Sequence, residues 1–202
     1  MTQSGDQAFR KSDNMGRWPE MTYGGALSFL RRRYSRDLDG VDLAVMGVPY
    51  DSAVTFRSGC RLGPQAVRAA SVQLAELLAF PWGFDPFETL GVVDYGDVFL
   101  DPHHPDTIAP AIYTAARDII AGGTKLLSIG GDHSIAYPLI KAHAEKYGPV
   151  ALVQFDAHCD TWPDDGTRMD HGTMFARAAR DGIIDVSRST QVGLRTYNDS
   201  DH

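Results

Sequence analysis

The segment 156–160, Asp-Ala-His-Cys-Asp, places two carboxylates and one imidazole at alternate positions directly after an apolar, strand-like run. An extended backbone puts alternate side chains on the same side. Asp156, His158 and Asp160 are therefore predicted to converge beyond the end of the strand. Such a concentration of negative charge is unfavourable unless a cation is bound there. A metal ion is the simplest such cation, and Cys159, at the intervening position, is predicted to point away from it.

A second candidate ligand is His133, which follows another apolar run within Gly130-Gly131-Asp132-His133-Ser134. If the two strands are neighbours, His133 lies about 5 Å from the segment 156–160, the spacing of adjacent strands. Two imidazoles with several carboxylates suit Mn²⁺, Zn²⁺ or Fe²⁺, and the absence of thiolate-rich spacing disfavours a structural zinc. Asp132 is expected either to orient an imidazole or to bind backbone N–H groups of its own loop.

The number of carboxylates exceeds what one catalytic zinc requires and favours two ions that share a water molecule. Two ions about 3.5–4 Å apart make hydroxide available near neutral pH for attack on an electron-poor carbon. The chemistry predicted from these residues is therefore hydrolysis.

Apolar runs that alternate with helical patterns must position these residues. Nearly unbroken apolar strands separated by helices predict an α/β domain whose parallel sheet is covered on both faces. Ligands of such sheets bind beyond the carboxyl ends of the strands, where 130–134 and 156–160 both fall. The predicted strands are 43–48, 90–93, 125–129, 150–155 and 190–193, and the predicted helices are one from Gly63-Pro64 through Leu77, then 108–120, 135–147 and 173–180.

The 202 residues are 43% hydrophobic and 22% charged, which is ordinary for a globular domain with one substantial core. Residues 1–40 are polar and irregular in pattern, so we assign them to an N-terminal arm and residues 41–202 to the α/β domain. The arm contains Arg31-Arg32-Arg33, which we interpret as a solvated face or an intersubunit contact.

Charge and apolar pattern exclude several kinds of partner. A formal net charge of −7 argues against binding of nucleic acid, which needs clustered Lys and Arg, and suits a small cationic molecule. No apolar run approaches the roughly 20 residues that cross a bilayer, and the N-terminus lacks the pattern of a signal peptide. We therefore expect a cytoplasmic protein without membrane contact, and the 2 cysteines do not indicate a disulfide framework.

The site motifs resemble those of the ureohydrolase family, which includes the arginases and agmatinases. Its motifs read Gly-Gly-Asp-His-Ser and Asp-Ala-His-x-Asp, as 130–134 and 156–160 do here. The resemblance covers residues 42–198 and is strongest to bacterial agmatinases. The other matching segments are Gly47-Val48-Pro49-Tyr50-Asp51, Arg61-Leu62-Gly63-Pro64, Phe80-Pro81-Trp82-Gly83-Phe84-Asp85, Asp170-His171-Gly172-Thr173-Met174-Phe175 and Gln191-Val192-Gly193-Leu194-Arg195-Thr196.

The resemblance implies an arginase-like, three-layer α/β/α fold around a mostly parallel sheet, a homotrimer or homohexamer, and two Mn²⁺ ions with a bridging hydroxide. His133 would bind one ion and His158 the other, with Asp156 bridging them. Asp160 would bind the first ion close to the hydroxide and accept its proton. His171 matches the family's proton-shuttling histidine, although its sequence context alone suggests a loop histidine at a helix start.

The sequence departs from the family pattern in one respect. The family's two remaining metal carboxylates and a glutamate that receives the guanidinium lie on later segments, so this chain carries four of six ligands. Asp199-Ser200-Asp201 has the spacing of the missing carboxylates without a preceding strand, and we interpret it as a solvated tail. We expect a polypeptide that ends at His202 to bind metal weakly and to lack appreciable turnover, and a non-catalytic family member is the corresponding alternative.

The implied reaction releases urea from a guanidino compound, and the loop 162–170 is expected to select the substrate. This loop is acidic and poor in hydroxyl groups, which favours agmatine, whose products are putrescine and urea. Arg168 is the counterargument, because it could pair with a carboxylate and favour guanidinobutyrate or guanidinopropionate. Arginine or another guanidine compound is the third possibility.

Overall fold

The first predicted strand forms as β2, Leu43–Val48, whose apolar residues after Leu43 are fully buried. This computed structural model describes residues 14–15 and 22–197, so the tail segment Asp199-Ser200-Asp201 lies outside the described residues. The chain divides into two units. Unit 1 contains the described residues up to Pro49 together with Leu62–Val98 and Ile119–Ile129, and unit 2 contains Tyr50–Arg61, Phe99–Asp118 and the described residues from Gly130 onward.

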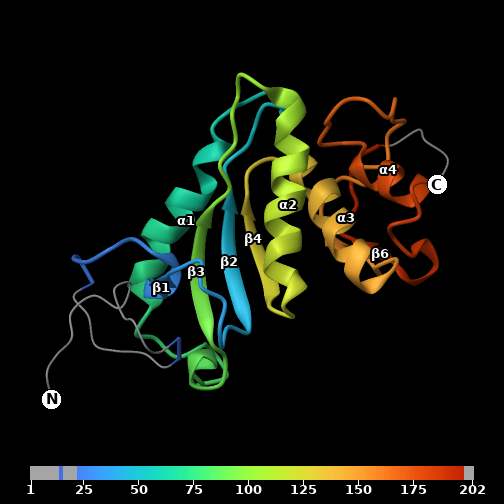
Figure 1. The fold of residues 1–202 in the computed structure, drawn as a ribbon. Coiled ribbons are helices and arrows are strands. Elements are labelled where there is room, and N and C mark those ends of the chain that lie inside the picture. Colours follow the sequence, from blue (N-terminus) through green and yellow to red (C-terminus); the bar gives the residue numbers. More distant parts are fainter. Residues whose placement is uncertain (1–13, 16–21, 198–202) are drawn as a thin grey trace, which may run out of the picture. The chain divides into compact units, whose positions relative to one another are not determined.

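Unit 1 is built on a four-stranded sheet of order β1-β3-β2-β4, in which β3 pairs in parallel with both β1 and β2 (Figure 1). Its other strands are β1 (Arg33–Tyr34), β3 (Val92–Asp97) and β4 (Lys125–Gly130). Helix α1, Gly63–Ser71, begins with proline in its first turn and gives way to a 3₁₀ turn, so it ends earlier than the helix predicted through Leu77.

Strand β3 continues four residues beyond the predicted end at Val93 because its polar residues have buried partners. The Asp94 side chain is fully buried and accepts hydrogen bonds from Arg68 Nε at 2.7 Å and Nη2 at 2.9 Å. Arg68 Nη1 also lies 2.6 Å from Asp97 Oδ1. Burial lowers the pKa of Arg68, but these hydrogen bonds outweigh it and hold that pKa above its ordinary value. A polar strand segment is thus accommodated in the interior of unit 1.

The interpretation of the arginine triplet as a solvated face is wrong. Arg31 and Arg32 are 1% and 2% exposed, and the Arg32 guanidinium lies 4.0 Å from the centroid of the Phe87 ring. Arg33 begins strand β1, which joins the sheet by pairing with β3. Two of the three arginines are therefore buried, and the third belongs to a strand of the sheet. The division into an arm and a domain stays a prediction.

Unit 2 carries α3, Ala136–Tyr147, which packs against α4, Met174–Arg180. Helix α2 runs from Ile108 to Ala121. No helix among the described residues is both long and apolar enough to cross a bilayer. Within residues 14–15 and 22–197, the 3₁₀ helices are Phe29–Arg31, Cys60–Leu62, Val72–Leu74, Pro86–Glu88, Pro105–Thr107, His133–Ile135 and Val186–Arg188.

Strand β5 covers only Val153–Phe155, and it pairs in parallel with β6, Thr190–Val192. Among the described residues these two strands form a sheet of their own, so β5 does not pair with β4 as the placement of His133 assumed. The backbone groups of β5 and its flanks bond to β6 instead, as in the hydrogen bond from Asp156 N to Val192 O. His133 and the segment 156–160 nevertheless belong to the same unit.

Candidate metal centre

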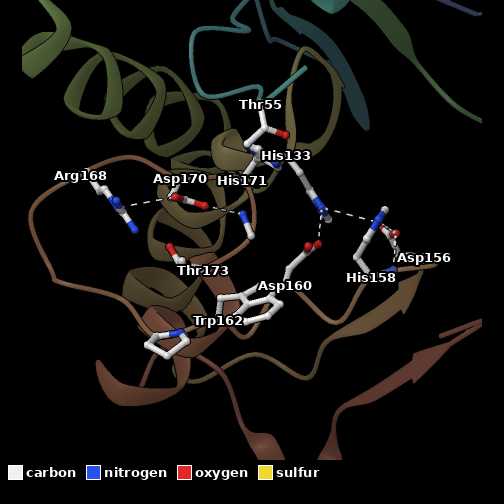
Figure 2. A pocket seen from close by; sticks show the side chains of 12 residues that line it. Thr55, His133, Asp156, His158, Asp160, Trp162, Arg168, Asp170, His171 and Thr173 are labelled. Atoms are coloured by element: carbon white, nitrogen blue, oxygen red, sulfur yellow. Dashed lines mark hydrogen bonds and ion pairs between the residues drawn. The ribbon is translucent and has the colours of Figure 1, made fainter. Parts of the chain in front are cut away.

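Three of the four predicted ligands meet in unit 2. One ligand atom from each of His133, Asp156 and Asp160 lies within 4.8 Å of the other two. His133 Nδ1 lies 2.8 Å from Asp160 Oδ2 and 3.7 Å from Asp156 Oδ2 (Figure 2). An imidazole and two carboxylates at this separation form a donor set that fits a divalent cation of borderline to hard character.

His133 is presented by a tight turn after β4. Asp132 caps this turn by accepting hydrogen bonds from the Ser134 N–H at 2.9 Å and from the Ser134 hydroxyl. Its other oxygen accepts from the Ala53 N–H at 3.0 Å. Asp132 thus acts as a loop carboxylate that binds backbone groups, the second of its two expected roles. The His133 ring itself packs edge-on against Phe175, with 5.4 Å between the ring centroids.

Asp160 reaches the cluster through a bend in the backbone and not through strand alternation. Strand β5 ends at Phe155, and Asp160 has a φ of 56°, in the left-handed region that non-glycine residues rarely adopt. Its carboxylate is buried and accepts a hydrogen bond from Gln154 Nε2 at 3.1 Å. Alternation along an extended strand therefore does not account for the position of Asp160, because β5 ends at Phe155 and Asp160 itself is left-handed.

His158 lies at the edge of the cluster. Its side chain is 65% exposed, and its Nδ1 lies 3.1 Å from Asp156 Oδ1. Burial raises the pKa of Asp156, but hydrogen bonds from the His158 N–H and ring, together with the charges of His133 and His158, outweigh it and hold that pKa below its ordinary value. Cys159 is buried and lies outside the group of potential ligands found among the described residues.

The candidate ligands border a cleft of about 480 Å³ in unit 2. The metal-ligand group lies along one side of the cleft, and the loop that follows Asp160 carries most of the other lining residues and forms a wall (Figure 2). The residues that line the cleft are Thr55, His133, Asp156, His158, Asp160, Trp162, Pro163, Arg168, Asp170, His171, Gly172 and Thr173.

His171 lies on the wall of this cleft, and its Nδ1 contacts the carbonyl oxygen of Ala53. A carbonyl oxygen can only accept a hydrogen bond, so Nδ1 must carry the proton in this contact. In the neutral ring the lone pair then resides on Nε2, which leaves that atom able to exchange a proton.

Thr55 is a cleft residue that the sequence patterns did not indicate. It lies on the loop 50–61, which follows the carboxyl end of β2, and this placement is the signal that could have revealed it. Buried Asp51 closes the loop by accepting hydrogen bonds from the backbone N–H groups of Gly59 at 2.6 Å and Arg61 at 3.2 Å. The loop is bonded in turn to the His133 turn, since Asp132 N donates to Tyr50 O at 2.7 Å.

Fold and site together define an α/β protein with a cluster of potential metal ligands at the ends of strands. The chain belongs to the arginase family, whose model matches residues 41–202. This membership confirms the expected resemblance and the arginase-like α/β fold class. The individual roles of His133, Asp156, His158, Asp160 and His171 stay predictions.

Curated relatives and solved structures agree with this assignment. The chain is 62% identical over 197 residues to the agmatinase of Chromobacterium violaceum, covering 96% of this chain and 61% of that protein. The agmatinase of Neisseria meningitidis serogroup C is 47% identical over 77% of this chain and 50% of its own length. This chain therefore spans between half and about three fifths of these relatives.

Two solved structures extend the comparison. A hypothetical agmatinase from Burkholderia thailandensis matches with a TM-score of 0.93 and 60% identity, covering 96% of this chain and 62% of its own. The proclavaminate amidino hydrolase of Streptomyces clavuligerus matches with a TM-score of 0.80 and 32% identity, covering 90% of this chain and 60% of its own.

Proposed function

We propose that the complete protein is a metal-dependent ureohydrolase that hydrolyses agmatine to putrescine and urea. The observation that carries the proposal is the group His133, Asp156 and Asp160, which lines a cleft. It occurs in a member of the arginase family whose relatives at 62% and 47% identity are named agmatinases.

The donor set supports a pair of divalent ions, for which we propose Mn²⁺. Asp156 directs Oδ2 toward His133 and Oδ1 toward His158, which is what a carboxylate shared by two ions requires. His133 and Asp160 would hold one ion and His158 the other. When bound, the ions would lower the pKa of water enough to supply a nucleophile near neutral pH.

Two residues of the chain, Asp160 and His171, would then accept and transfer protons. Attack on the guanidinium carbon adds one water across a C–N bond, so a proton must leave the nucleophile and another must reach the departing amine. Asp160 is placed to accept the first proton, because it lines the cleft and its carboxylate is oriented by a hydrogen bond from Gln154. His171, with its lone pair on Nε2, is placed to exchange the second with the amine or with solvent.

Charges on the cleft wall favour a substrate with a cationic tail. Arg168 Nε lies 3.6 Å from both Asp165 Oδ2 and Asp170 Oδ2, so two carboxylates balance one guanidinium there. The excess negative charge suits the ammonium group of agmatine. An ω-guanidino acid is the second candidate, because the Arg168 side chain is 61% exposed and borders the cleft, where a carboxylate could displace its partners.

The setting of the enzyme follows from its family resemblance. We propose a cytoplasmic homotrimer or homohexamer that contributes to putrescine biosynthesis within polyamine metabolism. Its substrate would be small and cationic, in keeping with the formal net charge of −7.

Urea release tests the proposal on the complete natural polypeptide loaded with Mn²⁺. Agmatine, 4-guanidinobutyrate, 3-guanidinopropionate and arginine are assayed in parallel, with Asp160→Asn as the inactive control. We expect the highest kcat/KM with agmatine. A higher kcat/KM with a guanidino acid would establish an ω-guanidino acid as the substrate. Release of no urea from any of the four compounds would exclude ureohydrolase activity.

A further inference from the structure

The wall of the cleft is an irregular loop that has one buried charge. We call residues 162–172 the cleft loop; it is closed at its base by a hydrogen bond from Trp162 N to Gly172 O at 3.0 Å. It contains neither helix nor strand, yet it carries Arg168, Asp170 and His171 to the cleft. A loop of this kind holds its position only if other contacts order it.

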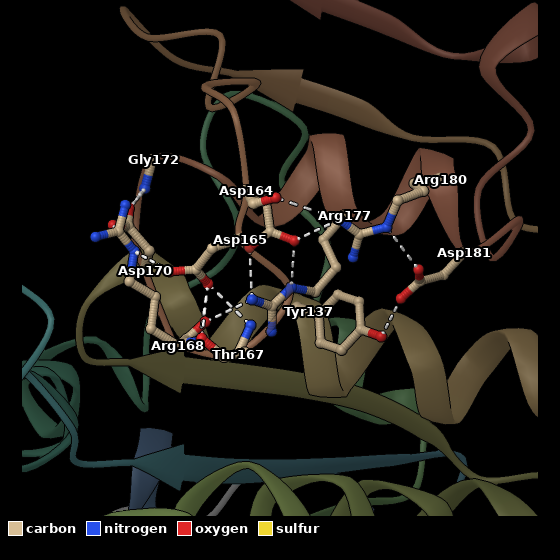
Figure 3. A network of polar contacts seen from close by, with 10 residues as sticks. All are labelled: Tyr137, Asp164, Asp165, Thr167, Arg168, Asp170, Gly172, Arg177, Arg180 and Asp181. Carbon is tan, nitrogen blue, oxygen red and sulfur yellow. Dashed lines mark hydrogen bonds and ion pairs between the residues drawn. The ribbon is translucent and has the colours of Figure 1, made fainter.

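The buried charge belongs to Asp164, whose side chain is 1% exposed. A buried carboxylate is unfavourable unless it is paired and hydrogen-bonded. Arg177 provides a two-pronged partner, with Nε 2.9 Å from Asp164 Oδ2 and Nη2 2.5 Å from Oδ1. Arg180, one turn further along α4, places Nη1 2.8 Å from Asp164 Oδ2. Both guanidinium groups therefore bind one loop carboxylate (Figure 3).

Arg177 binds the cleft loop at a second point. Its Nη2 donates to the carbonyl oxygen of Arg168 at 2.6 Å. One guanidinium thus fixes the loop four residues apart, and the second point directly precedes the stretch that carries Asp170 and His171. Both of these line the cleft, whereas Arg177 and Asp164 do not.

Helix α3 supports the two arginines from the other side. The Arg177 guanidinium carbon lies 5.3 Å from the centroid of the Tyr137 ring. The Tyr137 hydroxyl donates to Asp181 Oδ2 at 2.6 Å, and Asp181 Oδ1 accepts from Arg180 Nε at 3.2 Å. Arg177 is therefore held by Tyr137 of α3 as well as by the loop, and Arg180 by Asp181, which directly follows α4 (Figure 3).

We propose that Asp164 is a positioning residue that, through Arg177 and Arg180, fixes the cleft loop as a preorganised wall for substrate binding. This inference rests on the proposed function for the identity of the substrate. Asp164 does not touch the cleft, so it acts through the placement of Arg168, Asp170 and His171. The metal-ligand group lies on other segments, so the role of Asp164 is separable from metal binding.

The test compares Asp164→Asn with a matched control in the complete, Mn²⁺-loaded protein. Asp185→Asn is the control, because it also removes a carboxylate from an arginine, Arg188, whose Nε lies 2.6 Å from Asp185 Oδ2, and neither residue lines the cleft. We expect Asp164→Asn to raise KM for agmatine about tenfold or more, with a smaller fall in kcat and unchanged Mn²⁺ affinity. Asp185→Asn should leave all three values close to those of the wild type.

Trypsin cleavage after Arg168 reports the order of the loop without any substrate. The Arg168 side chain is 61% exposed, so the bond becomes cleavable once the loop moves. We expect faster cleavage in Asp164→Asn and, to a smaller extent, in Arg180→Met, which retains the Arg177 contacts and serves if Asp164→Asn fails to fold. Cleavage at the wild-type rate in the folded variants, or equal acceleration in Asp185→Asn, would overturn the proposal.

The two readouts also separate this inference from the proposed function. A wild-type protein that releases no urea from any guanidino compound would defeat the proposed function alone. The cleavage rates would still decide whether Asp164 fixes the loop, and wild-type KM values in a variant with faster cleavage would reject its role in substrate binding.

Discussion

Asp156 links the two histidines of the candidate metal centre, since each of its oxygens faces a different imidazole. His158 contacts only this carboxylate within the cluster, whereas His133 approaches both Asp156 and Asp160. Loss of Asp156 should therefore weaken both ion positions, and loss of His158 should weaken only one.

This difference predicts metal stoichiometry. After dialysis of the complete protein against limiting Mn²⁺, we expect His158→Ala to retain about one ion per chain and Asp156→Asn to retain fewer, since removing a ligand lowers affinity at least about tenfold. Elemental analysis measures both. Cys159→Ser is the control and should match the wild type. Equal losses in His158→Ala and Asp156→Asn would contradict the bridging position of Asp156.

The carboxylate of Asp164 should make the stability of the folded protein depend on pH. Hydrogen bonds from Arg177 and Arg180 lower its pKa to about 2. In the unfolded protein the Asp164 carboxylate takes up a proton at a higher pH than in the folded protein. The stabilisation of the folded protein by Asp164 is therefore present above about pH 4 and is lost as the pH falls toward 2. At neutral pH the depressed pKa corresponds to about 2 kcal/mol. Urea denaturation of wild type and Asp164→Asn should show this difference at pH 7 and a smaller one at pH 3. An equal difference at both pH values would argue against an ionised Asp164.

At the level of elements, β2 passes close to its neighbours at Gly47. A Cβ built at this position would lie 1.8 Å from Asp97 Oδ1 and 2.9 Å from the Cβ of Pro64 in α1. Asp97 cannot move freely, because its carboxylate binds Arg68 at 2.6 Å. The glycine therefore permits both helix packing and the buried ion network.

We expect Gly47→Ala to destabilise the protein by about 1–3 kcal/mol, as overpacking does in other cores. Gly122→Ala is the control, since a Cβ there meets no atom within 4 Å, and it should change stability by no more than about 1 kcal/mol. Urea denaturation midpoints compare the two. Similar effects of both substitutions would mean that contact with Asp97 and Pro64 does not limit position 47.

Strand β2 was predictable from its apolar pattern alone, whereas elements that rely on partners far along the chain were not. Strand β2 has the predicted bounds, because its residues alone require burial. Strand β3 extends through Asp94 only because Arg68 neutralises that carboxylate, which no local pattern reveals. The histidine and carboxylate motifs located the cleft, whereas Asp164 required the position of α4 to be known.

At the level of the molecule, the candidate centre lies within one unit. All of its potential ligands and all residues that line the cleft belong to unit 2, whereas the sheet β1-β3-β2-β4 belongs almost entirely to unit 1. The chain spans 61% of the length of the Chromobacterium violaceum agmatinase, so tests of metal binding belong with the complete polypeptide.

Metal binding should therefore protect the molecule unevenly. An ion stabilises only those conformations in which its ligands are assembled, by about 2.7 kcal/mol when its concentration is a hundred times Kd. Openings that disrupt only unit 2 are suppressed, while local openings of unit 1 are not. Hydrogen–deuterium exchange is measured with and without Mn²⁺. Addition of Mn²⁺ should slow exchange more in 130–134 and 156–160 than in β2 or β3. EDTA should reverse this slowing, and Asp156→Asn should not show it. Equal protection of β2 and β3 would instead mean that the two units open together.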